Sequence, residues 1–333
     1  MTVEFASLRR CAALALCGVL AGWLVAGWVE IALAADTSVL RGKNITFVEP
    51  YGPNSVTNVP IALMRAEIAR KSGATIDIIS MGGRAGGTAL DFINSPQDRL
   101  VFAVLDLISR ELAEKIGERP PLLATVQPVA LVSGAITTAL IVAEPSPIKT
   151  IDDFVTLARS RQLRIAHLGR KVAFGLELAM LEQKLGLHFA DKVVGTRAEI
   201  LAALASGEAD ASFLVTLTLL PSAQEAAPPV RAILTFGAKR NPDLATVPTL
   251  AERTSDPKAA IASSIAVFAP RDTPAEMVAA LESVLGEVAA EPAIKKEAAS
   301  RNFPLKVSPD AAVTAAMKRD ARVIGQHMSY LNR

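Results

Sequence analysis

The chain has 333 residues, of which 51% are hydrophobic and 20% are charged, so it is too apolar to be disordered and long enough for two domains. Its formal net charge is only +2, which is too weak a bias for nucleic acid or an anionic membrane surface to be the expected partner. Aromatic residues make up 5%, and this low share favours packed α/β layers over an aromatic-rich β-sandwich.

The first 34 residues have the composition of a secretory leader. Arg9 and Arg10 precede a long apolar run that ends in small residues near Ala34, which is the order found in export signals. We expect residues 1–34 to be a signal peptide and the mature chain to be exported. The apolar run is longer than usual for a leader, so an uncleaved membrane anchor is the alternative. Both cysteines lie in this segment, and the mature chain would have no disulfide.

Nine short apolar runs alternate with amphipathic segments after the leader. They predict strands at residues 45–48, 75–79, 100–105, 139–143, 163–166, 192–194, 211–215, 232–235 and 264–269. Such strands, separated by helices, indicate parallel sheets covered on both faces. Because nine strands exceed the need of one small sheet, we expect an α/β fold of two doubly wound domains.

Turn signals suggest where the chain passes between the domains and where its helices begin. Proline-containing stretches at residues 144–147 and 256–260 are the expected crossings. Domain 1 would then comprise residues 35–139 and 263–333, with residues 140–262 inserted as domain 2. Thr88, Thr196 and Thr273 each stand three residues before an acid, and this spacing predicts capping boxes at helix N-termini.

Four loops follow expected strands and precede expected helices, at residues 50–58, 81–88, 169–173 and 195–197. Ligands of open parallel sheets bind at the carboxyl ends of strands, where such loops gather. Backbone N–H groups at the following helix N-termini have no partner within the helix and can hold an anion. Two loops from each domain would line a cleft from both sides.

Each of these features also has a structural interpretation. The glycine-rich loop matches neither GxxxxGK[ST] nor GxGxxG, and a tight turn that lets a helix pack closely explains it equally well. Arg170, Lys171 and Arg197 would gain from an anionic ligand near a helix N-terminus, but each could simply extend into water. The sequence has no GxSxG, no HExxH and no Cys/His metal spacing. We therefore expect neither an enzyme nor a metal or cofactor site.

Four segments resemble the Bug-type receptors of tripartite tricarboxylate transporters. Residues 50–58 (PYGPNSVTN) are similar to P-[FY]-x-P-G-G-x-T-D, and residues 84–88 (RAGGT) to G-A-G-G-T. Residues 239–252 are close to R-x-x-x-x-P-x-V-P-T-x-x-E, and residues 269–274 to A-P-x-x-T-P. The resemblance covers nearly all of residues 43–330.

This resemblance implies a periplasmic solute-binding protein with a periplasmic-binding-protein-like Venus flytrap fold. Such a receptor closes on a small carboxylate, mostly through backbone N–H groups, and passes it to membrane transporter subunits. We expect a monomer without cofactor, metal or nucleic-acid partner. A ligand-binding partner of a membrane sensor, with no transport role, is the alternative, and an inner-membrane anchored form remains open.

Departures from the family pattern bear on the ligand. Asn58 replaces an Asp that would pair with an amino group. Arg170 and Lys171 stand in a loop that is usually made of small residues, and residues 194–197, which include Arg197, replace a Tyr-Lys-Gly-Gly stretch. These changes favour a di- or tricarboxylate, aromatic acids included, or an acid without an amine. The expected ligand-binding residues are Tyr51, Gly52, Asn54, Ser55, Thr57, Asn58, Ala85, Gly86, Gly87, Thr88, Gly169, Arg170, Lys171, Thr196 and Arg197.

Overall fold

The structure is a computed structural model that describes residues 35–52, 55–83, 86–221 and 228–331. The expected signal peptide and two expected ligand-binding residues, Asn54 and Ala85, lie outside these ranges. Within them, no helix combines the length and the apolar character needed to cross a membrane.

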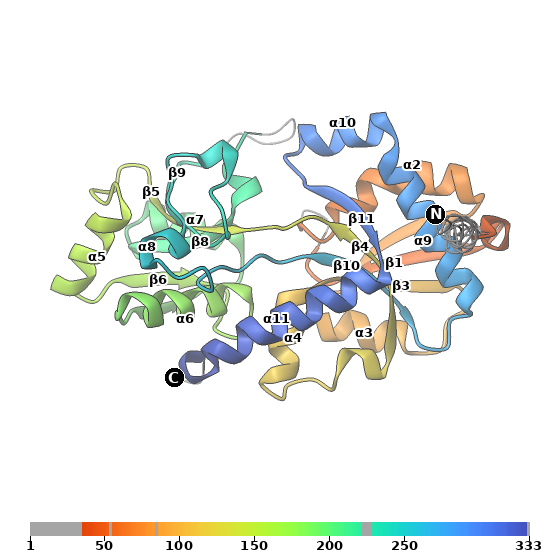
Figure 1. Cartoon of the computed structure of the whole chain (residues 1–333), viewed down its shortest axis with the longest axis horizontal. Coiled ribbons are helices and arrows are strands. Elements are labelled where there is room, and N and C mark those ends of the chain that lie inside the picture. Colours follow the sequence, from red (N-terminus) through yellow and green to blue (C-terminus); the bar gives the residue numbers. More distant parts are fainter. Residues whose placement is uncertain (1–34, 53–54, 84–85, 222–227, 332–333) are drawn as a thin grey trace, which may run out of the picture. The chain divides into compact units, whose positions relative to one another are not determined.

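The first sheet has six strands in the order β11-β4-β10-β3-β1-β2 (Figure 1). The strands are β1 Asn44–Glu49, β2 Thr75–Ser80, β3 Leu100–Asp106, β4 Val126–Ser133, β10 Ile265–Pro270 and β11 Leu305–Pro309. Their helical neighbours are η1 Thr37–Leu40, α2 Val59–Ser72, α3 Gly87–Ile93, α4 Leu107–Lys115, η3 Leu122–Ala124, α9 Ala275–Ala290, α10 Pro292–Ser300 and α11 Asp310–Leu331.

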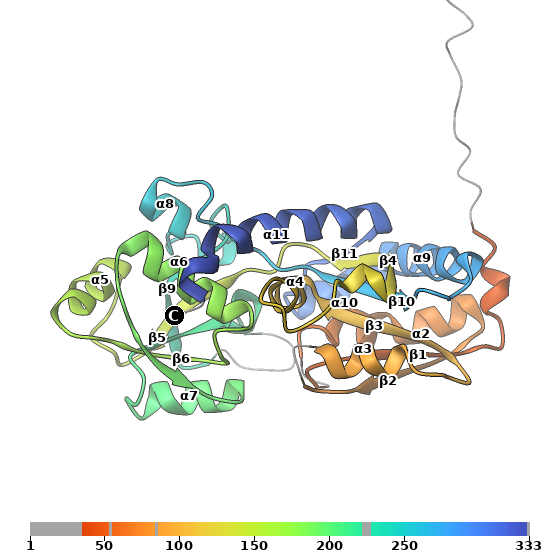
Figure 2. The same ribbon diagram turned by 90° about the horizontal axis from the view of Figure 1, so that it is seen from below.

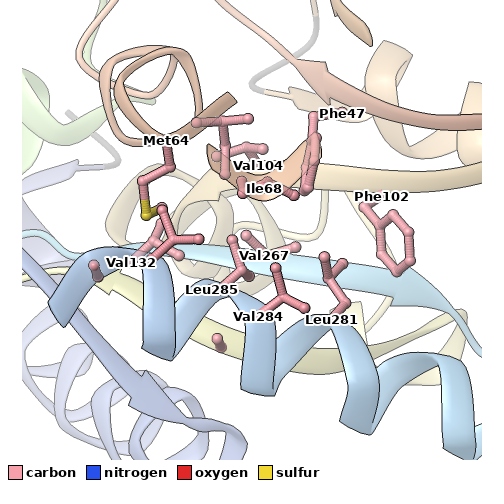
Figure 3. Packing of buried hydrophobic residues seen from close by; sticks show 14 of the residues in the cluster. Phe47, Met64, Ile68, Phe102, Val104, Val132, Val267, Leu281, Val284 and Leu285 are labelled. Carbon is pink, nitrogen blue, oxygen red and sulfur yellow. The ribbon is translucent and has the colours of Figure 1, made fainter. Parts of the chain in front are cut away.

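Both faces of this sheet are buried, as the uninterrupted apolar strands predict. Along β1, Phe47 packs into a core formed with α2 and α9, where it lies near Leu281 and Leu285 (Figure 3). The next residue, Val48, points to the opposite face and joins a second cluster that includes Leu90 of α3. Because successive side chains of a strand point to opposite faces of the sheet, β1 contributes apolar side chains to both cores.

The second sheet has five strands in the order β7-β6-β8-β5-β9. They are β5 Thr138–Ala143, β6 Arg164–His167, β7 Ala190–Val193, β8 Ala211–Val215 and β9 Val230–Thr235. The helices around it are α5 Ile151–Ser160, α6 Ala173–Leu185, α7 Arg197–Ala205, η4 Thr216–Leu219, η5 Pro242–Leu244 and α8 Leu250–Thr254. Alternate residues of β5 again enter two different clusters, Leu140 on one face and Ile141 on the other.

Two segments connect the sheets and run side by side (Figure 1). The first lies between the end of β4 at Ser133 and the start of β5 at Thr138, and the second precedes β10. An antiparallel bridge joins them, because Ile136 and Ser263 exchange backbone hydrogen bonds of 2.9 and 2.8 Å. Residues 144–147, expected as a crossing, follow β5 and include a turn, and the expected boundary at residue 140 lies inside that strand. The division into two domains itself stays a prediction.

The last helix, α11, contacts elements of both sheets. It packs on β4, β11 and α4, and further along on α6, as its course in Figure 2 shows. Ile324 and Leu331 of α11 belong to the same buried cluster as Leu140 and Phe213 of the second sheet. The core of the second sheet is thus completed by the C-terminal helix.

All nine expected strands overlap observed ones, but the sheets are mixed rather than parallel. β1 is parallel to β2 and β3, whereas β10 is antiparallel to β3 and β4. In the second sheet β5 is antiparallel to β8 and β9. Both β10 and β5 directly follow a connecting segment, so each begins at the sheet edge where its neighbours end, and β11, which follows α10, is antiparallel to β4 as well. The strands β4 and β11 were not expected.

Candidate functional site

The loop after β1 is organised around a buried carboxylate that the sequence analysis did not single out. Glu49 is the last residue of β1 and is fully buried. Its two oxygens accept hydrogen bonds from the backbone N–H groups of Tyr51 (2.9 Å) and Gly52 (2.7 Å) and from the hydroxyls of Ser55 (2.8 Å), Thr57 (3.2 Å) and Ser80. The carboxylate of Glu49 therefore occupies the anion-binding position of this loop, which the sequence analysis assigned to a ligand.

The start of α2 is also satisfied internally. Asn58 occupies the N-cap position with only 8% of its surface exposed, and its side chain makes no capping hydrogen bond. Its backbone N–H donates to the carbonyl (3.1 Å) and the hydroxyl (3.2 Å) of Ser55. Among the expected donors of this loop, Tyr51, Gly52 and Asn58 thus already have acceptors within the protein.

The glycine-rich loop leads into α3 by a glycine cap. Gly86 has a left-handed backbone (φ 84°) and takes the N-cap position, so Thr88 lies inside the helix. The expected capping role of Thr88 is wrong for that reason. A Cβ at Gly87 would lie 2.2 Å from a guanidinium nitrogen of Arg119, so the flexible end of that side chain would have to move. That guanidinium is 3.8 Å from the carboxylate of Asp91.

In the loop after β6, Arg170 is held by two carboxylates, Glu182 of α6 and Asp191 of β7. Its guanidinium donates to both oxygens of Asp191 at 2.7 Å and to both oxygens of Glu182 at 3.0 and 3.2 Å. The hydrogen bonds that Arg170 donates to Asp191, and then those to Glu182, raise the pKa of Arg170. The buried His167 lies 3.3 Å from Asp191 through Nε2 and accepts the N–H of Gly169 at Nδ1 (3.0 Å). Arg170 is therefore engaged in ion pairs with two acids of the protein.

The two other expected cations have partners as well. Lys171 forms an ion pair with Glu118, which lies in the loop after α4. Arg197, at the start of α7, donates to the Thr218 carbonyl at 3.5 Å. Thr196 caps α7 by accepting the N–H of Glu199 at 3.2 Å, which confirms the predicted helix start.

The first and third loops meet at Ser109, on the first turn of α4. The Tyr51 hydroxyl is close enough to Ser109 for that side chain to lower the pKa of Tyr51, and the N–H of Ala173 at the start of α6 donates to the Ser109 hydroxyl at 3.4 Å. Burial of the phenol hydroxyl and the nearby charge of Asp106 raise the pKa of Tyr51, although 47% of the residue is exposed. Loops from both sheets are thus in contact at Ser109, which no sequence motif marked.

Two carboxyl groups, Asp106 and Glu177, lie beside this contact. Asp106 ends β3 and caps α4, accepting the N–H groups of Ile108 (3.2 Å) and Ser109 (3.3 Å) as well as the hydroxyl of Ser263. Glu177 of α6 is 3% exposed, and one of its oxygens accepts the hydroxyl of Thr138. Burial, with a contribution from Asp106, raises the pKa of Glu177 to about 8. The second oxygen of Glu177, Oε2, has no hydrogen-bond partner within the described ranges.

The structure therefore joins the 50–58 and 169–173 loops through Ser109, and it leaves the 195–197 loop on α7 without a described contact to either. The part of the chain that is described contains no group of His, Cys, Asp and Glu able to hold a metal ion. The residues around Ser109 that the structure brings together carry hydroxyl and carboxyl groups.

Several solved structures share this fold. MatC from Rhodopseudomonas palustris with bound malate is 22% identical, with a TM-score of 0.69 over 84% of this chain and 98% of that chain. A second R. palustris protein, with adipate, is 20% identical, with a TM-score of 0.74 over 87% and 97%. The periplasmic binding protein BugD is 17% identical, with a TM-score of 0.72 over 86% and 97%. These likenesses confirm the expected Venus flytrap fold.

The search of curated proteins found no match to this chain. The family model described as the tripartite tricarboxylate transporter family receptor (TctC) matches residues 121–322, which is well over half of the chain. This is a family of solute-binding receptors and not a class of enzymes. The chain therefore belongs to the tripartite tricarboxylate transporter receptor family.

Proposed function

We propose that the chain is a periplasmic receptor that captures a small organic carboxylate and presents it to the membrane subunits of a tripartite tricarboxylate transporter. The observation that carries this proposal is the family match over residues 121–322. Structures of the same fold with malate and with adipate support a carboxylate as the ligand class.

The geometry is suited to capture by closure. The two sheets are connected by a pair of bridged segments at Ile136 and Ser263, and loops from both sheets approach each other at Ser109. A ligand that contacts both loops stabilises only the closed arrangement. Binding therefore shifts the population of receptor molecules from the open to the closed arrangement. A closed, loaded receptor then differs from an empty one at the surface that a membrane partner would recognise.

The proposed periplasmic location rests on residues 1–34, which would be removed on export. We also propose that the receptor is a monomer. An uncleaved anchor is the alternative. Both tryptophans of the chain, Trp23 and Trp28, lie in this segment. The exported protein should therefore show tyrosine emission alone, whereas tryptophan emission would show that the segment is retained.

A thermal-shift screen over organic acids, with amines and sugars in parallel, tests the ligand class. A ligand at one hundred times its Kd adds about 2.7 kcal/mol to the free energy of unfolding, which raises the midpoint by several degrees. We expect this rise from one or more organic acids. A rise with amines or sugars, and with no acid, would overturn the proposal.

A second function, as the binding partner of a membrane sensor, uses the same capture step. Membrane proteins retained by the immobilised receptor, with and without the acid found in the screen, distinguish the two. Transporter subunits are the expected partners, and retention of a sensor alone would favour signalling.

A further inference from the structure

We propose that Glu49 restricts this receptor to organic acids with a single carboxylate, because Glu49 itself fills the anion position formed by the loop after β1. The inference rests on the proposed function and narrows its ligand class. It departs from the sequence-based expectation of a di- or tricarboxylate, which depended in part on Arg170 and Lys171.

The first step concerns the donors of the loop. Both carboxylate oxygens of Glu49 accept hydrogen bonds, and the N–H groups of Tyr51 and Gly52 are among the donors. Glu49 has no exposed surface. A ligand carboxylate that took these N–H groups would leave Glu49 buried with fewer hydrogen bonds, which is strongly unfavourable for an ionised group. The exchange would also place two negative charges in one small loop.

The second step concerns the neighbouring charges. Asp106 is close enough to both Tyr51 and Glu177 to raise the pKa of each, so it contributes a negative potential to the contact between the loops. The two cations of the 169–173 loop do not offset this potential, because Arg170 and Lys171 are paired with acids of the protein. The negative charge of Asp106 would therefore repel a second carboxylate on the ligand, and neither Arg170 nor Lys171 would compensate for this repulsion.

Glu177 can accommodate one carboxylate of a ligand. Its buried Oε2 atom has no partner within the described ranges. Because the raised pKa of about 8 keeps this carboxyl group protonated at neutral pH, it can donate one hydrogen bond through its O–H, and a single carboxylate can accept it. Tyr51, a residue with 47% of its surface exposed, adds a large aromatic side chain nearby. An acid with one carboxylate and an uncharged remainder agrees with all three observations.

Calorimetric titration with matched acids tests the restriction. Hexanoate and adipate share a six-carbon skeleton, and benzoate and terephthalate share an aromatic ring; each pair differs by one carboxylate. We expect the wild-type protein to bind one monoacid at least tenfold more tightly than its diacid. In Glu49→Gln, which keeps the size of the side chain and removes its charge, this ratio should fall at least tenfold. The control Glu276→Gln removes one exposed negative charge from α9 and should leave the ratio unchanged.

The outcomes separate this inference from the proposed function. A wild-type preference for the diacid, or an equal ratio in wild type and Glu49→Gln, refutes the inference and leaves a carboxylate receptor. If neither the matched acids nor the acids of the thermal screen bind, the proposed function fails with it. Should Glu49→Gln not fold, the wild-type ratios of the two pairs decide alone.

Discussion

Replacement of Arg170 distinguishes a structural clamp from a ligand-binding cation. In Arg170→Ala, four charge-assisted hydrogen bonds to Asp191 and Glu182 are lost. The side chain of Glu182 is only 4% exposed, so its charge stays buried without a counter-ion, whereas Asp191 is 34% exposed and can be hydrated. Removing one partner of a buried ion pair costs about 3–5 kcal/mol. Since Asp191 is accessible to water, we expect the free energy of unfolding to fall by about 3 kcal/mol, the lower end of this range.

The assay is urea unfolding followed by circular dichroism at neutral pH, with acid binding measured on the same samples. Arg253→Ala serves as the matched control, because Arg253 pairs with Asp152 at the surface, where their side chains are 39% and 74% exposed. Exposed pairs contribute roughly 0–1 kcal/mol, so the control should stay close to wild type. Arg170→Lys should recover only part of the loss, because one ammonium cannot bridge two carboxylates as a guanidinium does.

The opposite pattern would refute this reasoning. If Arg170→Ala loses less than about 1 kcal/mol of unfolding free energy while its affinity for the acid falls tenfold or more, Arg170 acts on the ligand. The internal ion pairs would then have to open when the ligand binds.

Two further predictions concern proton binding and backbone packing. The pKa of Glu177 is raised from 4.5 to about 8, so the folded chain holds a proton that the unfolded chain releases, and the free energy of unfolding should fall as the pH rises through this range. The urea midpoint should fall less between pH 6 and pH 9 in Glu177→Gln than in the wild type. An equal fall in the two proteins would contradict the raised pKa of Glu177. Gly175→Ala should lower the free energy of unfolding by about 2 kcal/mol, because the new Cβ would lie 2.1 Å from the backbone oxygen of Arg170. Gly87→Ala should lower it less, because its Cβ meets only the movable side chain of Arg119. Equal urea midpoints for the two variants would show that the contact with the backbone is not decisive.

Features that depend on a few neighbouring residues could be predicted from the sequence. The Thr196 cap needs only the spacing to Glu199, and the structure has it. Thr88 has the same spacing to an acid, but Gly86 adopts a left-handed conformation that moves the helix start. The spacing alone does not reveal which of two candidate caps the backbone will use. The same limit applies to the strand ends, which shift by one or two residues.

The missed strand β4 has a physical explanation in Pro128. A proline inside an apolar run argues against a central strand, because it cannot donate to the ladder. In the structure Pro128 pairs with Phe268 at a shift in register between β4 and β10, where the regular hydrogen-bond pattern is interrupted. The strand therefore tolerates the proline through its partner, which lies 140 positions further along the chain. Such a pairing is not visible in a local pattern.

The neighbourhood of two expected loops could be predicted from the sequence, but the internal partners of their residues could not. The expected loops at Tyr51 and Gly169 do come together through Ser109, but the partners of Arg170 lie 12 and 21 residues away and are set by tertiary structure. A signal for Glu49 was present: a charged residue ends an apolar strand just before a loop rich in donors. Acids in such a position can be internal acceptors, and they should be weighed before a ligand is assigned.

The path of α11 has a consequence for the order in which the chain can fold. Ile324 and Leu331 are part of the core around β5 and β8, although more than 100 residues separate them from those strands. During synthesis or passage across a membrane, the strands of the second sheet emerge long before the helix that covers them. Their apolar surface then stays accessible to chaperones until α11 arrives. Export machinery that requires an unfolded chain would benefit from this delay.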